Sequence, residues 1–285
     1  MKRKLRYSIA LIFCLIISIQ TVQVKGIAPA KPDSLRHPAK SGTNQNDNLH
    51  GLSKSHPYRL SIRYKYDHFN KIFSPWNEWS IELKHQIKWG TLIGRVNDAS
   101  RFSHNGTQLE MDAYPVFRKG TYAYLNAGFS NGSVYPNYRL GASVYQAIPA
   151  HFVLGAGVRS MFFASQNVVL LTGTISKYVT NYYLAVHPYI DPNKKNQSVM
   201  LLIRRYLANS RNYIQVMAGA GSTPFGFNTN QDLTRLNSRN IELLLKKDLT
   251  STFLVEAAVG FEREEYRPNT FRDRYHAEIA VSYRF

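Results

Sequence analysis

The chain has 285 residues, with 36 Lys and Arg against 18 Asp and Glu, a formal net charge of +18 and one cysteine. A single cysteine excludes an internal disulfide and a multi-cysteine metal site. The cations are scattered rather than gathered on a basic helix or beside a base-stacking motif, and this argues against a nucleic-acid partner.

The segment 1–26 has the organisation of a secretion signal. Cations among the first six residues precede an apolar run at 9–19 that contains Cys14. A membrane-spanning helix needs about 20 apolar residues, roughly twice this length. The sequence therefore predicts a signal peptide cleaved after Val24-Lys25-Gly26, and export of the mature chain.

Residues 27–56 are rich in Pro, Ser, Asn, Lys and Gly and nearly free of aromatic residues. Such a composition cannot bury a core, so we expect a disordered polar periplasmic tail. The composition changes at Pro57. From there to the C-terminus we predict one domain, 57–285, which the following patterns identify as an outer-membrane β-barrel.

Successive segments after Pro57 alternate in hydrophobicity with a period of two, as strands do. An even number of strands is expected of a single-chain bacterial barrel. Twelve strands remain an alternative if Tyr182–Leu207 pairs irregularly. The fourteen predicted strands are Arg59–Phe69, Trp79–Lys88, Gly90–Phe102, Thr107–Arg118, Thr121–Ser130, Tyr138–Ile148, Phe152–Phe163, Val168–Val179, Tyr182–Ile190, Ser198–Leu207, Asn212–Gly221, Asn240–Leu249, Phe253–Glu262 and Arg274–Phe285.

The last strand indicates a membrane barrel most directly. Every second residue from Phe285 back to Tyr275 is apolar or aromatic, and the residues between them are polar or small. An apolar outer face rimmed by aromatic residues, with a polar lumen, is typical of transmembrane β-barrels. We therefore predict an all-β, antiparallel, up-and-down transmembrane barrel that closes by pairing the last strand with the first.

The connections fit this topology. With both chain ends in the periplasm, even-numbered connections such as Lys119-Gly120 and Thr180-Asn181 should be short turns. The odd-numbered connections should include longer extracellular loops, among them 131–137, 222–239 and 263–273. The predicted alternation of short and long connections favours a barrel over a β-sandwich.

Four segments, Gly90–Phe102, Glu110–Pro115, Tyr122–Gly128 and Tyr135–Arg139, closely resemble the YaiO family of outer-membrane β-barrel proteins. The similarity extends over residues 57–285. The resemblance implies an outer-membrane protein of a Gram-negative-type bacterium, with no established enzymatic activity and no cofactor. Many relatives carry helical repeats before the barrel, where this chain has its polar tail.

Strand parity points many charged side chains toward the lumen. The predicted lumen residues are Arg63, Lys65, Glu82, Lys84, Arg95, Arg101, Glu110, Asp112, Arg139, Arg159, Glu242, Lys246, Glu256, Glu262 and Glu278. Buried ions in such an interior pair with one another. The charge network that we expect to fill the lumen and pair across it comprises Glu82, Lys84, Arg95, Arg101, Glu110, Asp112, Arg139 and Arg159.

The principal functional prediction is a surface-exposed integral outer-membrane barrel without catalytic turnover and with little or no conductance. One alternative is a narrow charge-selective pore, because rings of charge set selectivity. Another is an outer-membrane hydrolase with acid–base candidates near the extracellular mouth, namely Asp67, His68, Asp98 and His104. We expect no catalytic, metal-binding or cofactor-binding site beyond these candidates, and no cofactor.

Two partners are expected from the membrane setting. Outer-membrane lipid and lipopolysaccharide would supply phosphates that balance cations at the membrane rim. The barrel-assembly machinery would recognise Phe285 and Tyr283 during insertion, a role implied by resemblance to other barrels. The sequence identifies no protein partner beyond that machinery.

Overall fold

The computed structural model describes residues 56–70, 73–101, 103–164, 166–193, 196–222 and 237–285. The predicted signal peptide and almost all of the predicted tail lie outside the described residues. No described residue is helical, and so no helix among them is long and apolar enough to cross a membrane.

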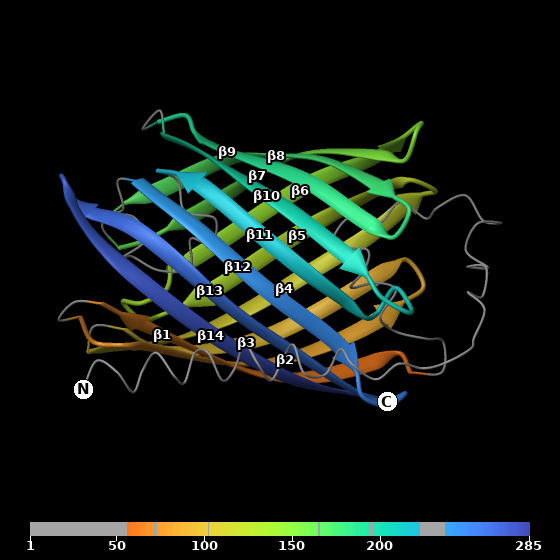
Figure 1. Cartoon of the computed structure of the whole chain (residues 1–285), viewed down its shortest axis with the longest axis horizontal. Helices are drawn as coiled ribbons and strands as arrows, with labels where there is room; N and C mark the ends of the chain where they lie inside the picture. The colour runs from red at the N-terminus through yellow and green to blue at the C-terminus, as the bar shows by residue number, and fades with distance from the viewer. Residues whose placement is uncertain (1–55, 71–72, 102, 165, 194–195, 223–236) are drawn as a thin grey trace, which may run out of the picture. The chain divides into compact units, whose positions relative to one another are not determined.

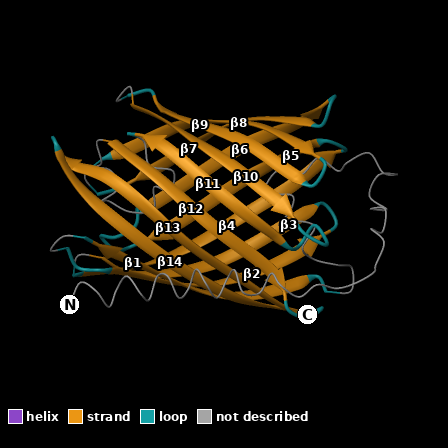
Figure 2. Cartoon of the chain, in the orientation of Figure 1, coloured by secondary structure: helices purple, strands orange, loops and turns teal. Residues whose placement is uncertain are grey.

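Fourteen antiparallel strands form a closed barrel, in which each strand pairs with its neighbours in the chain and β14 pairs with β1 (Figures 1 and 2). The predicted all-β barrel is confirmed. The alternative of twelve strands is wrong, because β9 and β10 pair in continuous register. The strands are β1 (Tyr58–Phe69), β2 (Trp76–Ile87), β3 (Gly90–Arg101), β4 (His104–Arg118), β5 (Thr121–Ser130), β6 (Tyr138–Ile148), β7 (Phe152–Phe162), β8 (Asn167–Val179), β9 (Tyr182–Asp191), β10 (Asn196–Tyr206), β11 (Tyr213–Gly221), β12 (Asn237–Asp248), β13 (Phe253–Arg267) and β14 (Thr270–Arg284).

The period-two pattern separates the two faces of the sheet. In β14, Ile279 and Val281 are 53% and 47% exposed, whereas Ser282 and Arg284 between the outer residues are both 2% exposed. Large apolar residues are exposed in the same way on the other strands. Such a large apolar surface is unfavourable in water, and it matches the lipid-facing band of a membrane barrel.

The chain's last residue takes part in closing the barrel. The backbone N of Tyr58 donates to the O of Phe285 at 3.0 Å, and the N of Phe285 donates to the O of Tyr58 at 3.1 Å. The Phe285 ring stacks on the rings of Tyr58 and Tyr283, at centroid distances of 5.5 and 5.8 Å. We call the end of the barrel with Tyr58 and Phe285 the Phe285 end, and the opposite end the loop end.

Short turns join the strands at the Phe285 end, as predicted, but one predicted loop at the opposite end is wrong. The segment 263–273 is mostly paired strand, because β13 continues to Arg267 and β14 begins at Thr270. The topology predicted a loop here because odd-numbered connections are the longer extracellular ones. In the structure, however, Arg272 Nε lies 2.6 Å from Glu264 Oε1 on the neighbouring strand, so these charges stabilise strand pairing.

Candidate functional site in the barrel lumen

Acidic residues occupy only one half of the barrel. The consecutive strands β5–β11 contain one acidic residue, Asp191, whereas the other seven strands contain fourteen. Those seven are contiguous around the barrel through the β14–β1 pair. We call β12–β14 with β1–β4 the acid-bearing half, and β5–β11 the acid-poor half. The fifteen residues predicted to face the lumen lie on the inner face, most of them in the acid-bearing half.

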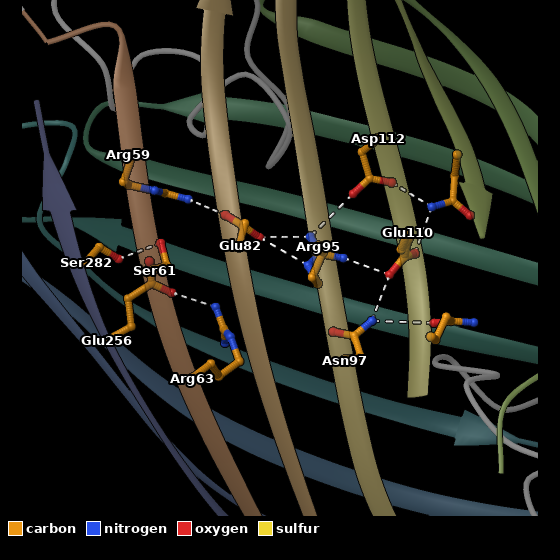
Figure 3. A network of polar contacts seen from close by, with 12 residues as sticks. Arg59, Ser61, Arg63, Glu82, Arg95, Asn97, Glu110, Asp112, Glu256 and Ser282 are labelled. Atoms are coloured by element: carbon orange, nitrogen blue, oxygen red, sulfur yellow. Dashed lines mark hydrogen bonds and ion pairs between the residues drawn. The ribbon is translucent and has the colours of Figure 1, made fainter. Parts of the chain in front are cut away.

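Arg95 on β3 is the centre of a polar network in the acid-bearing half (Figure 3). Its guanidinium lies 2.9 Å from Glu82 on β2, and 2.9 and 3.3 Å from Glu110 and Asp112 on β4. Glu82 also accepts a hydrogen bond from Arg59 on β1 at 2.9 Å. Cross-strand register produces this arrangement, because Glu82 pairs with Arg95 and Arg95 pairs with Glu110 on adjacent strands.

The network reaches the acid-poor half through neutral donors and one arginine. Asn126 on β5 donates to Glu110 at 2.7 Å and to Asp112 at 2.6 Å, and the Tyr124 hydroxyl donates to Asp112 at 3.1 Å. Arg139 on β6 lies 3.5 Å from Glu110. Charged hydrogen bonds of this kind are stronger than neutral ones, so the two carboxylates are firmly held.

A second set of ion pairs covers β12–β14. Lys246 Nζ lies 2.8 Å from Glu256, and Arg63 on β1 pairs with Glu278 and, at 3.4 Å, with Glu256. Toward the loop end, Arg272 lies 4.8 Å from the centroid of the Phe69 ring while it pairs with Glu264. The charges of this region are therefore largely neutralised by their neighbours.

The ion pairs follow the barrel wall. Within the part of the chain that the structure describes, each pair between strands joins strands one or two positions apart in the barrel. The sequence analysis expected pairs across the interior instead. Short side-chain reach explains the difference, since a cross-strand neighbour lies about 5 Å away.

Three predicted network residues lie apart from the Arg95 cluster. Arg101 pairs with Glu78 at 3.0 Å near the loop end. Lys84 is fully buried, and its Nζ has no hydrogen-bond partner within the described residues. Arg159 lies 5.7 Å from the centroid of the Tyr189 ring, and it has no ion pair with a described residue.

Arg204 on β10 is an inward cation that the sequence analysis missed. It donates to Gln215 Oε1 at 2.6 and 2.9 Å, and its guanidinium lies 4.0 Å from the centroid of the Tyr213 ring. Strand parity would have found it, because Arg204 is buried and Arg205 beside it is exposed. The Gln215 amide and the Tyr213 ring, both on β11, therefore help to hold this guanidinium.

Tyrosine rings pack on the inner face toward the Phe285 end. Tyr122 and Tyr145 stack with centroids 4.8 Å apart, within a buried cluster that includes Val153. Gly155 makes this packing feasible, because a Cβ there would lie 2.5 Å from a carbon of the Tyr145 ring. Other tyrosines lie on the outer face, such as Tyr66, whereas Tyr122 is buried on the inner face.

The structure does not gather the four hydrolase candidates into one site. Asp67 is buried on the inner face, whereas His68, Asp98 and His104 are exposed. Asp98 accepts a hydrogen bond from Thr107 at 2.8 Å on the outer face. Among the described residues, no group of three or more His, Cys, Asp or Glu could hold a metal ion.

The closed barrel, its apolar outer surface and its charged lumen define a membrane β-barrel protein. The chain belongs to the YaiO family, because the model of the YaiO membrane beta barrel domain matches residues 58–225, more than half of its length. The predicted family is therefore confirmed. No curated protein sequence matches the chain.

Solved structures share the fold at low sequence identity. The CymD monoaromatic hydrocarbon channel has a TM-score of 0.51 at 7% identity, and the match covers 86% of this chain and 94% of that one. A bacterial polysaccharide outer membrane secretin has a TM-score of 0.50 at 8% identity, with coverage of 82% and 100%. Omp33 of Acinetobacter baumannii has a TM-score of 0.49 at 10% identity, with coverage of 80% and 98%.

Proposed function

We propose that this surface-exposed outer-membrane barrel has no catalytic turnover and that its lumen is a narrow passage that prefers anions. The distribution of acidic residues carries the proposal, because seven consecutive strands place only Asp191 among their cations. This choice develops the charge-selective alternative of the sequence analysis. The conductance is expected to be small, since long side chains occupy both halves of the inner face.

The width of the barrel and the direction of its ion pairs support a passage. Eight strands leave an interior that side chains just fill, whereas 16 to 18 leave an aqueous channel. Fourteen strands lie between these limits. Because the described ion pairs run along the wall, they leave the centre of the lumen without a charged bridge.

The preference for anions follows from the acid-poor half. Arg159 faces the lumen there, 5.7 Å from the centroid of the Tyr189 ring and without an ion pair to a described residue. Arg204, also on the inner face, contacts the Tyr213 ring and the Gln215 amide. A guanidinium over an aromatic ring keeps its full charge, unlike one neutralised by an acid. A low-dielectric wall with one sign of charge concentrates counterions, so this half should attract anions.

Planar-bilayer recording of the purified protein tests the passage and its selectivity together. Under a potassium chloride gradient, we expect small current steps. Their reversal potential should be shifted toward the equilibrium potential of chloride. Arg159→Gln should move the reversal potential toward zero. Arg205→Gln is the matched control, because Arg205 is an exposed cation on the outer face of β10. Cation preference, or an equal shift in both variants, would contradict the proposal.

An absence of current steps would contradict the passage. It would instead support the closed structural barrel that the sequence analysis expected. The claim of no turnover has its own test. Purified protein incubated with lipid and peptide substrates should release no product above that of a boiled control. Hydrolysis that is lost on changing Asp67 or His104 would instead support the hydrolase alternative.

We propose that Phe285 and Tyr283 are recognised by the barrel-assembly machinery. Both rings lie on the outer face of the closing strand, 48% and 44% exposed. Deleting Phe285 should lower the amount of folded, heat-modifiable protein in the outer membrane. Phe253→Ala is the control, because Phe253 is exposed next to Tyr283 but is not terminal. Normal insertion of the deletion variant would contradict this role.

We propose that phosphates of the outer membrane bind cations at the rim. Arg239 and Arg263 are exposed on the outer face and lie directly opposite each other on β12 and β13. Like charges in this position repel unless an anion lies near them. Asp273 lies 3.9 Å from Arg263, so one of the two positive charges remains for an external phosphate. Arg239→Gln should reduce retention of lipopolysaccharide during detergent washing, measured against Lys247→Gln at the other rim. Unchanged retention would contradict the proposal.

A further inference from the structure

Three cations lie side by side on the inner face near the Phe285 end. Arg284 on β14 is the register partner of Arg59 on β1, and Arg59 is the register partner of Lys84 on β2. Their exposed fractions are 2%, 5% and 0%, respectively. Like charges on directly opposite positions are destabilising, so each of the three needs a compensating charge. Arg59 has Glu82 and Arg284 has Asp248, whereas Lys84 has no ion pair with a described residue.

Each of the three side chains has a buried nitrogen without a hydrogen-bond partner among the described residues. These atoms are Arg284 Nε, Arg59 Nε and Lys84 Nζ. The row has no acceptor at its β3 end, because Lys84 is opposite Ile93 there. Buried donors are nearly always satisfied in folded proteins, by protein, water or ion.

The neighbouring carboxylates already have other partners. The charged groups that act most strongly on Lys84 are Arg59, Lys246, Glu82 and Glu256. Glu82 pairs with Arg59 at 2.9 Å, and Glu256 pairs with Lys246 at 2.8 Å. With Lys84 protonated, these five residues carry three positive and two negative charges. One positive charge is therefore not balanced, and it lies on Lys84, which has no ion pair with a described residue.

We infer that the Arg284–Arg59–Lys84 row binds a small oxyanion, a carboxylate or a phosphate. Lys84 supplies the balancing charge, and the free N–H groups of Arg59 and Arg284 supply directed donors. An oxyanion can accept several hydrogen bonds at once, which matches three unsatisfied donors from adjacent strands. A buried cation without such a partner would carry a large desolvation cost.

The inference goes beyond the proposed passage. The row lies in the acid-bearing half, whereas Arg159 and Arg204 lie in the acid-poor half. An oxyanion bound there would be a fixed part of the wall, and it would bind whether or not the lumen conducts. Binding measurements therefore separate this site from the channel recordings.

Calorimetric titration of the purified barrel with sodium acetate, and separately with inorganic phosphate, tests the site. Ionic strength is held constant with a bulky sulfonate buffer. Saturable binding of one anion is expected, and Lys84→Met should weaken it at least about tenfold, since it removes the balancing charge. Lys65→Met is the matched control, because Lys65 also lies on the inner face but has Glu278 and Glu78 as register partners.

A second measurement uses only the unmodified protein, in case Lys84→Met does not fold. Its unfolding temperature should rise with acetate or phosphate concentration at constant ionic strength, because a ligand of the folded state stabilises it. No saturable binding and no rise would overturn the inference. Equal weakening by Lys84→Met and Lys65→Met would also overturn it, since only general charge attraction would then remain. The anion that binds more tightly, acetate or phosphate, shows whether the site prefers a carboxylate or a phosphate group.

Discussion

The two halves of the barrel hold their inward cations in different ways. In the acid-bearing half, Arg95 contacts three carboxylates within 3.3 Å. In the acid-poor half, Arg204 contacts the Gln215 amide and the Tyr213 ring. Both cations lie on the same kind of surface, the inner face of a closed sheet. The difference lies in the partners that neighbouring strands provide.

The two kinds of partner have different effects on the stability of the barrel and on the net charge of its lumen. A cation among carboxylates contributes little net charge to the lumen, and it holds neighbouring strands together through charged hydrogen bonds. A cation on an aromatic face keeps its charge and contributes less to stability. We therefore expect substitutions in the acid-bearing half to affect mainly unfolding, and cation substitutions in the acid-poor half to affect mainly ion preference.

The largest effect is expected for Arg95→Leu. Removing this guanidinium leaves Asp112 without an arginine partner, and leaves Glu82 and Glu110 with one each. Breaking a buried pair costs about 3–5 kcal/mol, so a loss of about 3 kcal/mol is expected. Urea unfolding in lipid vesicles, followed by the gel shift on boiling, measures it. Arg159→Leu is the comparison, and an equal loss there would remove the energetic distinction between the halves.

A smaller loss is expected for Gly155→Ala in the acid-poor half. The new Cβ would lie 2.5 Å from the Tyr145 ring, which would have to move and disturb its stack with Tyr122. Overpacking of this kind costs about 1–3 kcal/mol. The same unfolding measurement applies. Gly94→Ala is the matched control, because a Cβ at Gly94 meets no atom within 4 Å. A similar loss of unfolding free energy in both variants would contradict the role of the Tyr145 contact.

The strands and their faces could be predicted from the sequence because alternation is a local property. The predicted bounds of Thr121–Ser130 and Tyr138–Ile148 are those of β5 and β6. The ends of β13 and β14 were missed because these strands continue past the apolar band. There Glu264 and Arg272 stabilise each other across the pair. Outside the membrane, a charged strand and a charged loop have similar compositions.

The partners of the inward residues could not be predicted in the same way. Parity assigns Lys84 and Glu82 to one face, but the register between strands decides which residue lies beside each. Lys84 falls between Arg59 and Ile93, whereas Glu82 lies opposite Arg95. A shift of two residues in either pairing would keep every face unchanged and exchange these partners. Composition carries no information on that shift.

Arg204→Leu should cost less than the two changes above. It removes hydrogen bonds to Gln215 and a guanidinium 4.0 Å from the Tyr213 ring. Together these contacts are worth about 1–2 kcal/mol. In bilayer recording, the same variant should reduce the preference for chloride. A loss as large as that of Arg95→Leu, with unchanged selectivity, would contradict the comparison between the halves.

The smallest effect is expected for Arg205→Gln, one residue along β10. Arg205 is exposed on the outer face, and its guanidinium lies 6.0 Å from the centroid of the Tyr182 ring. An exposed contact of this kind is worth about 0.5 kcal/mol or less. The charge removed is the same as in Arg204→Leu, but it lies on the opposite face of the sheet. Unfolding and ion preference should therefore both stay close to those of the unmodified barrel. A clear change in selectivity would mean that charge on the outer rim, rather than charge on the inner face, governs ion passage.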